Sequence, residues 1–196
     1  MGKHVPDART RWTSGGTLPP TPEECLRILS AYRVPAHIVG HSRIVARLAR
    51  RLSLELGAIL PCPPEPARME AAGLLHDIAK KPGPDNLNDH ATEGGTILRA
   101  LGMPEIALLV EKHINPGPTG PLERLREMDL LSYCDKRVKH REIVSLDERF
   151  DDLLSRYGAI DNAIALRIVE TAGVIRRVEK KIFANLPFSP ATLDSW

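Results

Sequence analysis

The amino-acid sequence predicts an all-α protein of seven or eight helices. Two observations favour this class: apolar residues recur at helical spacing in every long segment, and prolines and glycines separate these segments. A third is that strand-like patterns are almost absent, since the pairs Ile143-Val144 and Ala159-Ile160 are too short to form strands. Aromatic residues make up 4% of the chain, which suits helices packed through smaller apolar side chains.

Helix boundaries follow from capping residues and helix breakers. Thr21 is a suitable N-cap before Pro22, and Ser145 with Glu148 three residues later is a capping-box pattern. Glycines such as Gly57 and Gly102, and proline-rich segments such as 61–66, mark the ends. The predicted helices cover approximately residues 22–33, 35–56, 66–80, 89–101, 104–114, 121–138, a segment opened by Ser145, and 160–185.

Length and composition indicate one domain with a short tail. The chain has 196 residues, of which 42% are hydrophobic and 27% charged, as in ordinary globular proteins. Residues 1–18 have no periodicity and are expected to form a flexible tail, so the domain covers residues 19–196. The net charge of +2 is too balanced to indicate nucleic acid as the main partner.

The sequence also suggests where the protein works. Three cysteines form an odd and sparse set, which favours a reducing cytoplasm over a disulfide scaffold. The first twenty residues hold no apolar run, so no signal peptide is expected. No stretch approaches the roughly 18 apolar residues of a membrane span.

Histidine and aspartate side chains lie on otherwise apolar helix faces. His41 shares a stripe with four aliphatic residues of its helix, and His113 and Asp135 share faces with aliphatic residues and methionine. The adjacent pair His76-Asp77 follows an apolar run, and His90 opens a helix. Burying these groups is costly unless they are paired or bind a cation. If these side chains converge on a transition metal, the bound metal would offset that cost. Histidine and carboxylate donors without thiolate suit iron, manganese, cobalt, nickel or catalytic zinc.

Each of these residues alone also has an ordinary structural interpretation. A histidine such as His41 on an apolar stripe is most often a hydrogen-bonded core residue, and His90 could simply be a helix-start residue. Asp135 alone would be a surface residue paired with a neighbouring cation such as Lys136. The ordered set on separate helices is what favours a metal site.

The residues in this order resemble the HD-domain metal-dependent phosphohydrolases, whose pattern is H…HD…D on a helical bundle. The matching segments are His41-Ser42-Arg43, Leu75-His76-Asp77-Ile78 and Cys134-Asp135-Lys136, within residues 35–157. His90-Ala91-Thr92-Glu93-Gly94 and Lys112-His113-Ile114-Asn115 are similar to the additional ligands of the two-metal branch, nearest to the symmetrical diadenosine-tetraphosphate hydrolases. No Gly-Tyr-Pro signature is present, unlike in cyclic-di-GMP phosphodiesterases, and the short 81–89 loop leaves little room for a large lid.

The resemblance implies an HD-type bundle that hydrolyses a phosphoester or phosphoanhydride bond of a nucleotide-like substrate with a metal-activated water. It implies two divalent transition metals per chain, one held by His41, His76, Asp77 and Asp135 and the other by His90 and His113, with Asp77 bridging. Asp77 and Lys80 are the expected catalytic residues, and substrate contacts are expected from Lys80, Lys136 and His37. For both lysines the alternative is a solvated side chain, which we favour for Lys136.

Two other functions are compatible with the same ligands. A mixed-valent di-iron oxygenase branch uses a similar cage on this fold, and a non-catalytic signalling bundle could hold a structural metal. The stripe in the last helix is most simply a core stripe, and its alternative role is a homodimer interface. It comprises Ile164, Ile168, Thr171, Ile175, Val178 and Ile182.

Overall fold

The structure is a computed structural model that describes residues 18–80, 89–118, 124–184 and 186–196. The expected N-terminal tail, apart from Leu18, lies outside the described residues. The same holds for the 81–89 loop, apart from Asp89, and for the expected helix start at Pro121.

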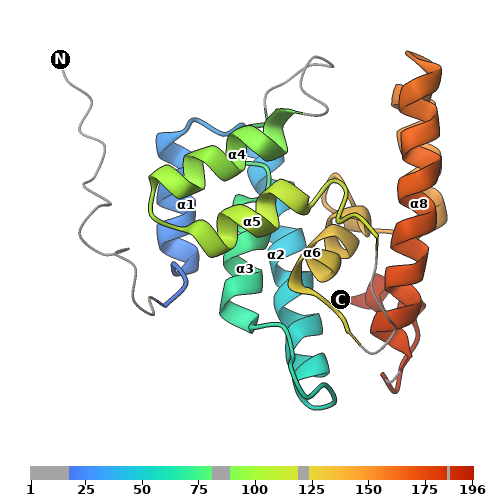
Figure 1. Ribbon diagram of the computed structural model, residues 1–196, viewed down its shortest axis with the longest axis horizontal. Coiled ribbons are helices and arrows are strands. Elements are labelled where there is room, and N and C mark those ends of the chain that lie inside the picture. The colour runs from blue at the N-terminus through green and yellow to red at the C-terminus, as the bar shows by residue number, and fades with distance from the viewer. Residues whose placement is uncertain (1–17, 81–88, 119–123, 185) are drawn as a thin grey trace.

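The described chain is a helical bundle with one two-stranded sheet, which confirms the all-α prediction (Figure 1). Helices α2, α3, α5 and α6 lie at its centre, with α1 and α8 on opposite sides (Figure 1). The α-helices are α1 (Pro22–Ala31), α2 (Ala36–Gly57), α3 (Pro66–Leu75), α4 (Asp89–Ala100), α5 (Pro104–Lys112), α6 (Glu127–Lys136), α7 (Leu146–Leu153) and α8 (Asn162–Phe183). A π-helical turn (Leu154–Gly158) follows α7, and a 3₁₀ helix (Pro190–Ser195) follows α8.

The predicted caps form at two helix starts. The Thr21 hydroxyl accepts a hydrogen bond from the Glu24 backbone N–H, and the Glu24 carboxylate accepts one from the Thr21 N–H, as in a capping box. The Ser145 hydroxyl likewise accepts from the Glu148 N–H at 3.1 Å. These bonds satisfy N–H groups that a helix start leaves without partners.

The core forms where α2 and α3 pack closely together. A Cβ atom added at Gly73 would lie 2.5 Å from the Cα of Ala46, so only glycine allows this approach of the two helix backbones. Fully buried leucines fill the interior around this crossing; they include Leu48, Leu52, Leu75, Leu98, Leu130 and Leu131. The crossing fixes the positions of the chain segments that carry His41 and His76.

The third helix ends earlier than the sequence predicted. We expected it to continue to Lys80, but α3 ends at Leu75 and residues 76–79 form tight turns. The N–H of Ile78 bonds to the carbonyl of Leu75, and the N–H of Lys80 bonds to that of Asp77. The helix therefore ends before the predicted stop at Pro82, at the point where the buried side chains of His76 and Asp77 begin their contacts.

A short hairpin follows α6, where we expected no strand. Strand β1 (Val138–Lys139) pairs antiparallel with β2 (Glu142–Ile143), with Val138 opposite Ile143. His140 has a φ of +56°, which allows the tight reversal between them. The guanidinium of Arg137 donates to the carbonyl of Val144 beside the hairpin. The strand pairing depends on the geometry of the turn and on Arg137. It does not need alternating apolar side chains, so the sequence shows no strand pattern there.

Helix α8 forms one side of the bundle, and only part of it is buried. Ile175, Val178 and Ile182 are fully buried, so the second half of the predicted stripe is core. Towards the helix start, Leu166 and Val169 are exposed, with 60% and 56% of their surface accessible. The homodimer role of this helix stays a prediction. In the described part of the chain, no helix has the length and apolarity that crossing a membrane requires.

Candidate metal centre

His41 and Asp135 meet at the centre of the bundle from two different helices. His41 lies in the second turn of α2 and Asp135 in the last turn of α6. The Nε2 atom of His41 lies 3.0 Å from Oδ1 of Asp135, and the same oxygen lies 3.6 Å from Nε2 of His76. Residues 94 positions apart in the sequence therefore form one contact.

Asp77 is the most connected residue of the cluster. It lies in the turn after α3 and is 1% exposed. Its Oδ2 atom is 3.3 Å from Nε2 of His76. Its Oδ1 atom is 3.3 Å from Nε2 of His90 in the first turn of α4, and 3.7 Å from Nε2 of His113, which caps the end of α5. The two oxygens of one carboxylate thus face different histidines.

Backbone carbonyls orient two of the imidazole rings. Nδ1 of His76 lies 2.8 Å from the carbonyl oxygen of Gly73, and Nδ1 of His113 lies 2.6 Å from that of Val110. A carbonyl oxygen only accepts, so Nδ1 carries the proton in both rings and Nε2 points to the centre. This arrangement is typical of metal-binding histidines, whose second nitrogen is fixed by an outer hydrogen bond.

The cluster contains buried polar atoms that a metal would satisfy. Nε2 of His76 and Oδ1 of Asp77 have no hydrogen-bond partner within the described chain. Such atoms are rare in folded proteins because each costs free energy. Two groups of three residues have ligand atoms close enough to share an ion: His41, His76 and Asp77, and then Asp77, His90 and His113. Nitrogen and carboxylate oxygen donors without thiolate fit divalent transition metals.

The charges in the cluster also suit a cation. Burial acts to raise the pKa of Asp77, but His76 and Lys80 outweigh it and hold this pKa well below its usual range. Burial acts to lower the pKa of His76, yet the carboxylates of Asp77 and Asp135 raise it to about 10. Burial and the charge of His76 lower the pKa of His113 to about 3. The ionised carboxylates and the neutral imidazole of His113 are thus in the forms that bind metal, whereas His76 must lose a proton when a metal binds.

The three predicted substrate contacts lie in different surroundings. Nζ of Lys80 lies 2.8 Å from Oδ2 of Asp77, and its side chain is 37% exposed at the rim of the cluster. The ammonium of Lys136 contacts Asp135 and is largely buried, so the solvated side chain that we favoured is wrong. His37 is exposed at the start of α2, and no hydrogen bond or ion pair in the described residues joins it to the cluster.

The sequence analysis did not identify Arg149, which lies on α7. This residue is 8% exposed, its Nη1 atom donates to Asp152 at 2.9 Å, and its Nε atom has no hydrogen-bond partner among the residues described. Burial and Asp77 have the largest effects on the pKa of Lys80, and the charge of Arg149 acts to lower it. Nothing in the local sequence distinguishes it from a surface arginine.

The six predicted metal ligands thus meet from α2, the turn after α3, α4, α5 and α6. No curated protein and no solved structure matches the chain. The family pattern described as the HD domain matches residues 38–147, which is more than half of the chain and contains all six residues. By this match, and in agreement with the geometry of the cluster, the chain belongs to the HD domain family.

Proposed function

We propose that this protein is a metal-dependent phosphohydrolase with two metals in each chain. The observation that carries the proposal is the position of Asp77 in both three-residue groups, with its two oxygens towards different histidines. A carboxylate that bridges two metals is the usual arrangement in two-metal hydrolases. The HD domain family, which consists mostly of metal-dependent phosphohydrolases, supports the same chemistry.

Each residue would then have a definite task. His41, His76 and Asp135 would hold one metal, His90 and His113 the other, and Asp77 both. When bound, the metals would lower the pKa of a water molecule and neutralise charge on the phosphoryl oxygens. The carbonyls of Gly73 and Val110 keep Nε2 of His76 and His113 directed inward, so these ligands need little reorganisation.

Lys80 is the best candidate for contacting the substrate phosphate. Its ammonium lies beside Asp77, and more than a third of its side chain reaches solvent, so an incoming phosphate can approach it. Lysine binds phosphate as a point charge and needs no fixed orientation. Lys136 would instead neutralise and position Asp135, which it contacts directly.

We propose a small nucleotide-like substrate with a phosphoester or phosphoanhydride bond, processed in the cytoplasm. The resemblance to symmetrical diadenosine-tetraphosphate hydrolases makes a dinucleoside polyphosphate the first compound to test. Two buried free thiols, Cys25 and Cys134, are compatible with a reducing compartment.

The test is a panel of nucleotides and dinucleoside polyphosphates assayed without oxygen in the presence of Mn²⁺ or Fe²⁺. We expect the protein to cleave a phosphate bond and to place ¹⁸O from labelled water in the product. The Asp77→Asn variant should lose this activity. Symmetrical cleavage of diadenosine tetraphosphate would give ADP alone, whereas asymmetrical cleavage would give ATP and AMP. Turnover that requires O₂ would identify the oxygenase alternative, and metal binding without turnover of any compound would indicate the non-catalytic one.

A further inference from the structure

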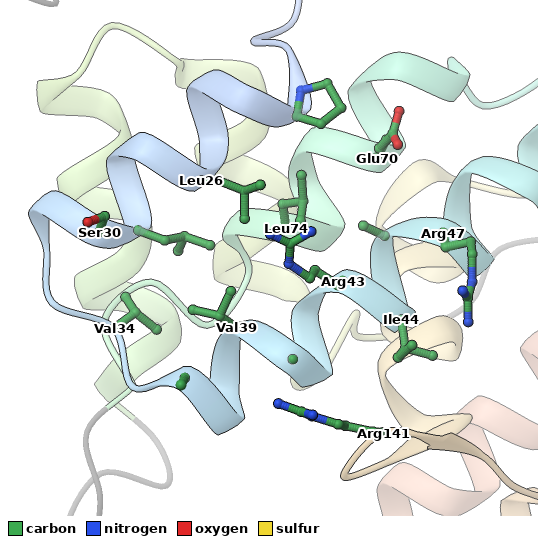
Figure 2. Close-up of a pocket in the computed structure, with 15 residues that line it drawn as sticks. Leu26, Ser30, Val34, Val39, Arg43, Ile44, Arg47, Glu70, Leu74 and Arg141 are labelled. Carbon is green, nitrogen blue, oxygen red and sulfur yellow. The ribbon is translucent and has the colours of Figure 1, made fainter.

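A concave site whose lining includes none of the proposed metal ligands lies on the bundle. It is a groove of about 810 Å³ between α1, α2 and α3, and this volume lies within the range of about 300–1,000 Å³ typical of small-molecule sites. Figure 2 shows its apolar wall, formed by side chains from three different segments. They include Leu26, Leu29, Val34, Val39, Ile44 and Leu74.

Three arginines border this apolar wall. Arg43 and Arg47 come from α2, and Arg141 comes from the turn of the β1–β2 hairpin (Figure 2). None of the three forms an ion pair with a carboxylate in the described residues. The acidic residue of the groove, Glu70, is already paired with Arg50, whose Nε lies 3.2 Å from its carboxylate. The groove therefore has a surplus of positive charge.

Gly40 brings the third arginine to the groove. A Cβ atom at this position would lie 2.4 Å from Nε of Arg141 and 2.9 Å from its Nη2. The guanidinium thus lies directly against the α2 backbone, in space that any other residue would fill. Residues 40, 43 and 47 are three or four positions apart and share one face of the helix. Arg141 is therefore brought to the same face as Arg43 and Arg47.

We infer that this groove binds an amphipathic organic anion, with its apolar body on the aliphatic wall and its oxyanion group between the arginines. A guanidinium is weakly hydrated and offers paired N–H donors that match carboxylate, phosphate or sulfonate oxygens. Burial of the apolar body removes exposed aliphatic surface from water. None of the six proposed metal ligands lines the groove, and His41 points away towards Asp135. The lining of the groove is thus distinct from the set of proposed metal ligands.

The matched probes are 8-anilinonaphthalene-1-sulfonate and N-phenyl-1-naphthylamine, which share an aromatic body and differ in the sulfonate. Fluorescence titration of the wild-type protein is expected to show one saturable sulfonate site per chain. The neutral compound should bind at least about tenfold more weakly, because a hydrogen bond to a charged group contributes strongly to affinity. Equal affinity for the two compounds would overturn the inference.

Variants locate the site. The double variant Arg43→Gln, Arg141→Gln should weaken binding of the sulfonate probe by about tenfold or more. Arg176→Gln removes an exposed arginine that pairs with Asp147 on another face, and should leave the affinity unchanged. If the control weakens binding as much as the double variant does, the probe is bound by general surface charge and the inference fails.

Gly40→Ala provides a test that changes no charge. Its Cβ would displace the Arg141 guanidinium, the flexible end of an exposed side chain, so the fold should persist while the probe binds more weakly. Gly57→Ala lies on the same helix with nothing within 4 Å of the added atom, and should bind like wild type. Thermal unfolding and metal content, measured in parallel, show whether both proteins keep the native structure. Unchanged probe affinity in a folded Gly40→Ala protein would contradict the role of Arg141.

Competition then identifies the anionic group. Decanoate and decyl phosphate carry the same chain with different oxyanions, and decanol carries it with none. Displacement of the probe by either anion at concentrations where decanol has no effect supports the inference, and the stronger competitor identifies carboxylate or phosphate as the preferred group. Equal displacement by decanol, or none by either anion, would overturn it.

Discussion

Oδ1 of Asp77 lies 3.3 Å from Nε2 of His90, although Asp77 is in the turn after α3 and His90 is in the first turn of α4. The other oxygen of the same carboxylate faces His76. One aspartate thus joins two groups of histidines that come from separate helices. The proposed two-metal chemistry depends on this relationship, and the first predictions concern it.

Asp77→Asn should remove both metals. The amide keeps the shape of the side chain but lacks the charge and the second oxygen donor that a bridging ligand needs. We expect metal content to fall from about two ions per chain to near zero, with loss of hydrolysis. Elemental analysis of the purified variant measures this. Asp147→Asn, which changes an exposed carboxylate paired with Arg176, is the control and should keep both ions.

His113→Ala should remove only the second metal. His113 belongs to the group with Asp77 and His90, whereas His41 and His76 belong to the other group. Metal content should fall from about two to about one per chain on the two-metal scheme. We expect kcat to fall by at least about a hundredfold, since loss of even outer-shell partners costs about 10–100-fold. A variant that keeps two tightly bound ions would show that His113 is not a ligand.

Lys80→Met and Lys136→Met should have different effects. Lys80 is partly exposed beside Asp77, so its loss should raise KM by about tenfold, while the metal content stays unchanged. Lys136 is buried against Asp135, so its loss should weaken metal binding and protein stability. Steady-state kinetics and metal analysis of both variants make the comparison. An unchanged KM in Lys80→Met would remove this lysine from the substrate site.

Metal binding should release about one proton per chain between pH 7.5 and 9. In the metal-free protein, His76 has a pKa of about 10, because the Asp77 and Asp135 carboxylates outweigh its burial, so Nε2 is protonated in this range. A metal must replace that proton, so its apparent affinity should rise with pH until about 10 and then level off. His113 has a pKa of about 3, lowered by burial, and has no proton to release. Titration calorimetry in buffers of different ionisation enthalpy counts the protons, and a count of zero would contradict the assignment.

Gly73→Ala should destabilise the protein by about 1–3 kcal/mol, the usual cost of overpacking a core. The added atom would lie 2.5 Å from the backbone of Ala46, which cannot move without separating α2 from α3. Gly57→Ala is again the control, because it lies at the end of α2, its added atom meets nothing within 4 Å, and it should not destabilise the protein. Urea unfolding of the three proteins measures the difference. Equal stability of Gly73→Ala and wild type would show that the helices do not pack this closely.

Much of the fold was predictable because helical periodicity and caps are local signals. Ser145 and Thr21 marked helix starts correctly, since a cap needs only residues within the next turn. The apolar stripe around His41 indicated an inward direction for the same reason. The end of α3 was not predictable, because contacts of His76 and Asp77 with distant helices decide it.

Features that depend on contacts between residues far apart in the chain could not be predicted from the sequence. Lys136 looks like a surface lysine from its neighbours, and its burial follows from the packing of α6. His37 is one turn from His41 but is exposed at the start of α2. Gly40 and Arg141 are about a hundred residues apart, so their contact gives no motif. Local patterns predicted which groups face inward, whereas tertiary contacts determine their partners.

The central claim is that Asp77 bridges two metals, and anomalous diffraction from crystals grown with Mn²⁺ tests it most directly. The account predicts two anomalous peaks about 3.5–4 Å apart, one on each side of the Asp77 carboxylate. His41, His76 and Asp135 should surround one peak, and His90 and His113 the other. A single peak, or two peaks of which only one lies within about 2.5 Å of an Asp77 oxygen, would contradict the claim.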